Sequence, residues 1–112
     1  MNLKSVLEEA GAKESQQLAL FAILNLGVIE SIASGTMTAS DAIRLIYHAE
    51  NCRYVRDHFL PKIADRIMSH GVQLPDLVDA LPVEEAHREL RHELEVMRSL
   101  CLKILEKKKR AA

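Results

Sequence analysis

The chain has 112 residues, a length that fits one small domain around a single core. Hydrophobic residues make up 48% of it and charged residues 28%, a balance typical of a folded globule and not of a disordered segment. The formal net charge of −1 and the aromatic content of 4% argue against a general attraction to nucleic acid or to membrane surfaces.

Three features predict where the protein works. Cys52 and Cys101 stand far apart and form no metal-ligand or disulfide pattern, which is typical of the reducing cytoplasm. The N-terminal stretch has acidic residues where an export signal needs a long apolar run. The most apolar segment, Leu18 to Ile29, is about a dozen residues long, against the roughly 20 that a membrane span needs. We therefore expect a cytoplasmic protein without a membrane segment.

Helical periodicity runs through every long segment, so the sequence predicts an all-α fold. We expect a compact bundle of four or five main helices, forming a single domain over residues 1–112. A short first helix is expected to begin near Leu3 and to end before Gly11. The longest helix is expected at the C-terminal end, from Pro82 to about Lys109, with acidic residues first and basic residues last, as the helix dipole favours.

The second helix is predicted to be the centre of the fold. It runs from about Glu14 to Ser34, and Gly35 follows at the position of a left-handed cap. Because this helix is apolar on nearly all sides, either the other helices wrap it or a second subunit covers its remaining face. Asn25 lies within the apolar arc, where its side chain needs a hydrogen-bond partner.

The middle of the chain predicts three further helices. A capping box that opens with Thr38 starts a third helix, which is expected to reach Asp57 or beyond. A fourth helix is expected to begin near Pro61 and to end at Gly71. A separate short helix is expected to begin at Pro75.

The third helix carries a stripe of hydrogen-bonding side chains. Its members, at positions i, i+4, i+7 and i+11, include both tyrosines of the chain: Tyr47, Asn51, Tyr54 and His58. Tyrosine is a common anchor of protein interfaces, so we predict that the stripe contacts a protein partner. The alternative is that both rings cover the edge of the core with their hydroxyls in water.

The C-terminal helix carries a heptad seam, which is the clearest pattern in the sequence. After Val83 it consists of His87, Leu90, Leu94, Met97, Cys101 and Ile104. We predict that the seam pairs with its twin in a homodimer; in a parallel, in-register pair, Cys101 would face its twin and oxidation would crosslink the two chains. The alternative is that the seam packs on the second helix inside one bundle.

The histidines of the segment HRELRHELE do not form a metal site. His87 and His92 are five residues apart, so they diverge by about 140° around the helix axis and cannot hold one ion together. Each also closes a Glu-x-x-His pair, with Glu84 and Glu89, but di-iron bundles draw such pairs from different helices. We predict a solvated charged face, with no metal.

His48 and Cys52 lie one turn apart but supply only two of the four ligands of a structural zinc site. As a nucleophile, Cys52 lacks an oxyanion hole and a third group that would orient the histidine. We therefore predict no catalytic site and no cofactor.

The basic run KKKR at residues 107–110 could contact phosphates, or it could simply complement the helix dipole. A helix-turn-helix interpretation of residues 38–58 lacks the glycine turn, so nucleic acid is an unlikely partner.

These patterns favour a small, non-catalytic cytoplasmic interaction or regulatory protein. It is expected to self-associate as a homodimer, with a second protein as a possible partner. Two alternatives are a metal- or small-ligand-binding bundle that uses His48 and Cys52, and a nucleic-acid accessory protein that uses the basic run.

Overall fold

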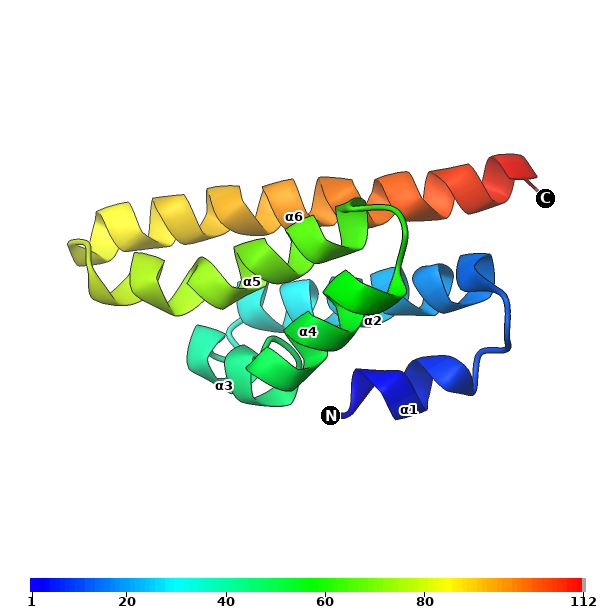
Figure 1. Cartoon of the computed structure of the whole chain (residues 1–112). Helices are drawn as coiled ribbons and strands as arrows, with labels where there is room; N and C mark the ends of the chain where they lie inside the picture. Colours follow the sequence, from blue (N-terminus) through cyan, green and yellow to red (C-terminus); the bar gives the residue numbers. More distant parts are fainter. Residues whose placement is uncertain (112) are drawn as a thin grey trace.

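The computed structural model describes the backbone of residues 1–111 and the side chains of residues 1–107. This part of the chain consists of helices and loops, which confirms the all-α bundle with a long C-terminal helix. The elements are α1 (Leu3–Glu8), α2 (Glu14–Ala33), α3 (Ala39–Leu45), α4 (Ala49–His58), α5 (Ile63–Asp79) and α6 (Val83–Ala111). Figure 1 shows α6 along the whole length of the molecule, with α1, α3 and α4 on the side away from it.

The core lies where α2 and α5 pack along α6. The short helices close the rest of it: α3 and α4 pack on α5, and α1 packs on α2 and α4. One continuous cluster of buried side chains joins α1 to α6. The hydrogen bond between His70 of α5 and Glu93 of α6 ties these two helices together at the edge of the core.

Helix α2 has the predicted ends. It begins at Glu14, and Gly35 beyond its C-terminal end has a φ of +80°, the left-handed conformation that glycine adopts without strain. At 20 residues, α2 is long and apolar enough to cross a membrane, which corrects the shorter length estimated from its most apolar segment. The core helix of a globular protein meets the same criterion, and α2 buries Gln17 and Asn25, whose side chains hydrogen-bond within the chain.

The expected third helix is in fact two helices. The predicted capping box is present at the start of α3, where the Thr38 hydroxyl accepts from the Asp41 N–H and the Asp41 carboxylate accepts from the Thr38 N–H. The helix then stops at Leu45, because the backbone of its C-cap Ile46 leaves the helical range at a φ of −133°, and the Tyr47 N–H bonds back to the Ala42 carbonyl. His48 caps the new helix, α4.

Helix α5 joins the two helices that were expected on either side of Gly71. It continues through Gly71 and also through Pro75, which lies inside the helix. Proline cannot donate the hydrogen bond to the residue four positions earlier, which here is Gly71. The buried positions Ile67, Met68 and Leu74 lie on one face, so packing stabilises the continuous helix despite the two breaker residues.

Candidate functional site

Tyr47 lies in the centre of the bundle and not on its surface. Its side chain is 2% exposed, and its hydroxyl donates a hydrogen bond to Oδ1 of Asn25 on α2, at 2.8 Å. Its ring lies against Gly71 of α5, where an added Cβ atom would be 2.5 Å from the ring carbon Cδ1. Burial, with smaller effects of the Cys101 and Cys52 thiols, raises the pKa of Tyr47 above its usual value, so the hydroxyl remains a donor. Tyr47 therefore packs between α2 and α5. The prediction that Tyr47 contacts a protein partner is wrong, because its side chain is buried.

Asn51, the second residue of the predicted stripe, is also buried. Its Oδ1 accepts from the backbone N–H of Leu3 at 3.0 Å, and its Nδ2 donates to the carbonyls of Met1 and Ile46, both at 2.9 Å. These three bonds join α4 to the start of α1 and to the end of α3. Asn51 thus satisfies backbone groups inside the chain, and it is not available to a partner.

Tyr54 and His58 are the two stripe residues that reach the surface. Their rings stack with centroids 4.7 Å apart, and Nε2 of His58 lies 2.7 Å from Oε1 of Gln17. The Tyr54 hydroxyl is covered yet has no hydrogen-bond partner in the described part of the chain. Burial, and then the nearby Glu8 carboxylate, raise the pKa of Tyr54. The interface role of this pair stays a prediction, now limited to Tyr54 and His58.

The heptad seam packs inside the bundle. Its central members are buried in the common core, namely Leu94, Met97, Cys101 and Ile104, while Leu90 is half-buried and His87 is exposed. The partners of the seam are α2 and α5 of the same chain. The heptad seam of α6 therefore packs inside one bundle, which was the alternative to the homodimer. Its buried side chains are not available to pair with a second copy of α6.

The two cysteines are free and differ in burial, and this predicts an order of reaction. Burial raises the pKa of the fully buried Cys101 to about 12, so Cys101 carries almost no thiolate near neutral pH. Cys52 is half-buried, and burial and then Asp65 raise its pKa as well. We expect iodoacetamide to modify Cys52 before Cys101 in the native protein and both after unfolding, as peptide mass spectrometry would measure. A Cys101–Cys101 crosslink after mild oxidation would contradict this placement.

The metal-ligand candidates already have partners in the chain. His48 caps α4 by accepting from the Asn51 N–H through Nδ1, and its Nε2 lies 3.1 Å from the Met1 carbonyl. The Cys52 thiol donates to the Tyr47 carbonyl at 3.5 Å. Among the residues with described side chains, no three His, Cys, Asp or Glu residues are grouped to hold a metal ion. His48, as the N-cap of α4, and Cys52, in the first turns of α4, are thus structural groups bonded to the chain around the turn between α3 and α4.

The charged surface gives little support to a nucleic-acid interface. Of the basic run at residues 107–110, only Lys107 has a described side chain, so most of that prediction lies outside the described residues. The exposed face of α4 carries as many acids as arginines, in the order Glu50, Arg53, Arg56 and Asp57. Such a balanced face lacks the excess of positive charge with which proteins bind phosphate backbones.

An apolar surface on α2 is left uncovered, and we call it the α2 open face. Ile23 is 54% exposed at its centre, and Leu20 and Leu24 beside it are half-buried. Gly27 continues the same face one turn later, and an added Cβ atom there would meet nothing within 4 Å. On α6, Leu102 borders this face: it is 50% exposed and lies one turn beyond Arg98, which pairs with Glu30 of α2. The α2 open face consists of Leu20, Ile23, Leu24, Gly27 and Leu102.

The α2 open face answers a question that the sequence left open. Apolar residues on nearly all sides of this helix indicated that either other helices or a second subunit must cover it. The other helices cover only part of it. The signal that could have located the uncovered part is the pattern of Leu20, Ile23, Leu24 and Gly27 at i, i+3, i+4 and i+7, which the more regular heptad of α6 overshadowed.

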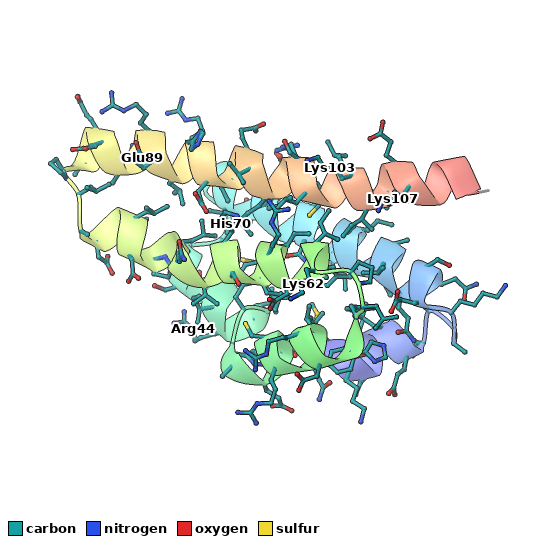
Figure 2. All side chains as sticks on the ribbon, turned by 45° about the horizontal axis from the view of Figure 1, so that its top comes forward. Arg44, Lys62, His70, Glu89, Lys103 and Lys107 are labelled. Carbon is teal, nitrogen blue, oxygen red and sulfur yellow. The ribbon has the colours of Figure 1, made fainter. Side chains whose placement is uncertain are left out.

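A cleft of about 750 Å³ opens at the end of the bundle where α2 and α5 begin and α6 ends. Its lining comes from α2, from the loop before α5 with the first residue of α5, and from α6: Glu14, Ser15, Leu18, Pro61, Lys62, Ile63, Lys103, Ile104, Glu106 and Lys107. Figure 2 labels Lys62 at the start of α5 and Lys103 and Lys107 on α6, and all three line the cleft. The residues of this site are far apart in the chain, so no sequence pattern indicated it.

The fold and these surfaces define a small all-α bundle with an uncovered apolar helix face and a cleft at one end. Residues 11–112, which include α2 to α6, match the model of a family described as a protein of unknown function (DUF3969), and the chain belongs to that family. No curated protein and no solved structure matches the chain.

Proposed function

We propose that the protein is a small, non-catalytic cytoplasmic interaction protein that forms a homodimer through the α2 open face. The observation that carries the proposal is the exposure of Ile23, at 54%, in the middle of the most apolar helix of the chain. Burying apolar surface stabilises an assembly by about 25 cal/mol per Å². Contiguous apolar patches on a folded protein commonly mark an interface, so the α2 open face is the natural contact surface.

A second copy of the chain fits this face because the face is self-complementary. Leu20 and Gly27 lie at equal distances from the midpoint between Ile23 and Leu24. If two copies of α2 cross antiparallel about a two-fold axis at that midpoint, Leu20 of each copy lies opposite Gly27 of the other. The space above Gly27 is open, so it can receive a leucine side chain. A two-fold pair uses each such contact twice.

The dimer predicts a selective effect of charge on oligomeric state. We expect the wild-type protein to sediment as a dimer and the Ile23→Glu variant as a monomer, because the new carboxylate would be desolvated at the centre of the interface. Val72→Glu is the matched control, since Val72 is a similarly exposed aliphatic residue, at 46%, on α5. Analytical ultracentrifugation across a dilution series measures the outcome.

Circular dichroism of both variants would establish that each is folded. A wild-type protein that stays monomeric over the whole series would refute the dimer, and so would equal loss of dimer in the two variants. Binding of the wild-type protein to lipid vesicles through Ile23, without any dimer in solution, would also refute it.

A second protein partner is part of the proposal, with Tyr54 and His58 as its contact. A surface hollow lined by Tyr54, His58 and Arg53 supports this assignment, because tyrosine and arginine are common anchors of protein interfaces. The alternative of a small-ligand-binding bundle is supported by the cleft at the end of the bundle. The pair of His48 and Cys52, which the sequence suggested as its site, does not line this cleft.

A further inference from the structure

We propose that the cleft at the end of the bundle binds a free long-chain carboxylate, with the alkyl chain along the apolar lining and the headgroup at the lysines. The inference goes beyond the dimer and does not depend on it. The volume of about 750 Å³ lies within the roughly 300–1,000 Å³ of small-ligand sites. Three separate segments of the chain form the walls, so the shape of the cleft depends on the folded bundle.

The floor of the cleft is apolar. Leu18 of α2, Ile63 of α5 and Ile104 of α6 line it from three helices, and Pro61 adds apolar surface from the loop before α5. Leu18 and Ile63 are half-buried, so part of each side chain remains open to an occupant. An alkyl chain in this position would remove apolar surface from water on both sides of the contact.

The rim of the cleft supplies positive charge. Lys62, Lys103 and Lys107 all line it, and none of the three forms an ion pair among the described residues. Two acids, Glu14 and Glu106, also line the cleft. Oε2 of Glu14 accepts a hydrogen bond from the Leu60 N–H at 3.3 Å, and Glu106 also has a partner. Lysine stems can lie along apolar surface while their ammonium groups reach a headgroup, which suits an amphiphile with a negative end.

The start of α5 adds to the same preference. Lys62 occupies its N-cap position and makes no side-chain capping bond. The first backbone N–H groups of a helix have no acceptor within the helix, and the helix dipole places partial positive charge there. A carboxylate held by Lys62 would therefore lie near unpaired donors at the end of a 17-residue helix.

The proposed ligand needs both an alkyl chain and a negative charge, and probes that lack one of the two test this requirement. We expect isothermal titration of the full chain to detect laurate, used below its micelle concentration. Inorganic phosphate has a negative charge but no chain, and dodecyltrimethylammonium has the chain but a positive charge; we expect at least ten-fold weaker binding for each. Equal binding of dodecyltrimethylammonium, or no binding of laurate, would overturn the proposal.

Variants locate the binding in the cleft. We expect Lys103→Glu to weaken laurate binding about ten-fold, whereas Arg91→Glu, the same charge change on an exposed part of α6 outside the cleft, leaves it within about two-fold. Ser15→Trp should block the site, because Ser15 is an exposed polar residue of the lining whose replacement fills the cleft without removing a core side chain.

Three results would show that the cleft is not the site. One is equal weakening by Lys103→Glu and Arg91→Glu. Another is laurate binding that persists in Ser15→Trp but disappears in Ile23→Glu, which would place the ligand on the α2 open face. The third is binding to vesicles of anionic lipid without binding to free laurate, which would identify a membrane surface as the occupant. Circular dichroism of each variant separates loss of binding from loss of fold.

Discussion

Replacement of Asn51 by alanine is expected to lower the free energy of unfolding by about 2–5 kcal/mol, because each buried group left without a partner costs about 1–3 kcal/mol. The Leu3 N–H and the Ile46 carbonyl are the two buried groups that would lose their partner, and the Met1 carbonyl is a third, partly buried one. The same change detaches α1 and the end of α3 from α4.

Urea denaturation followed by circular dichroism measures this effect. Arg53→Ala is the control, since Arg53 is exposed on the same helix, and its change should stay within about 0.5 kcal/mol. Asn51→Asp is a sharper variant: it keeps the acceptor for the Leu3 N–H but turns an oxygen toward two carbonyls that now accept from Nδ2. If Asn51→Ala and Arg53→Ala unfold at the same urea concentration, the three bonds do not hold the segments together.

The second large effect is expected from Gly71→Ala, which should destabilise the fold by about 1–3 kcal/mol through overpacking. The added Cβ would lie 2.5 Å from Cδ1 of Tyr47, closer than atoms can approach without movement. The ring cannot simply turn away, because its hydroxyl is bonded to Asn25 and its surroundings are packed. An alanine in the middle of a helix would otherwise increase stability by about 0.5–1 kcal/mol.

Gly27→Ala makes the same chemical change in α2 and should have the opposite sign. Nothing lies within 4 Å of the added Cβ, so only the helix propensity counts, and the gain should be about 0.5–1 kcal/mol. Both variants should be compared in the Ile23→Glu background, so that self-association does not contribute to the measured stability. Thermal unfolding that moves in the same direction for both variants would be inconsistent with the Tyr47–Gly71 contact.

The elements that the sequence predicts best are those whose signals are local. The capping box at Thr38, the left-handed Gly35 and the apolar period of α2 depend on neighbouring residues, and each has the predicted place. The requirement that Asn25 must have a partner was also recognisable. The identity of that partner was not, because Tyr47 is 22 residues away and reaches Asn25 only when the chain turns between α3 and α4.

The errors arise where tertiary packing outweighs local preference. Glycine and proline end helices in isolation, yet α5 continues through Gly71 and Pro75 because its apolar face packs on α6 and because Gly71 makes room for Tyr47. The heptad of α6 was recognised, but a heptad fits a neighbouring helix of the same chain as well as a twin. The cleft could not be recognised locally, since its lining comes from three segments that are far apart in the chain.

The bond between the Leu3 N–H and Asn51 has a consequence for the order in which the protein matures on the ribosome. The two residues are 48 positions apart, so the first turn of α1 leaves the exit tunnel long before the amide that completes it. Until then α1 is a short helix of 6 residues, too short to persist alone in water. We infer that α1 is among the last elements to settle, and that the chain organises around α2 before α1 is fixed in place.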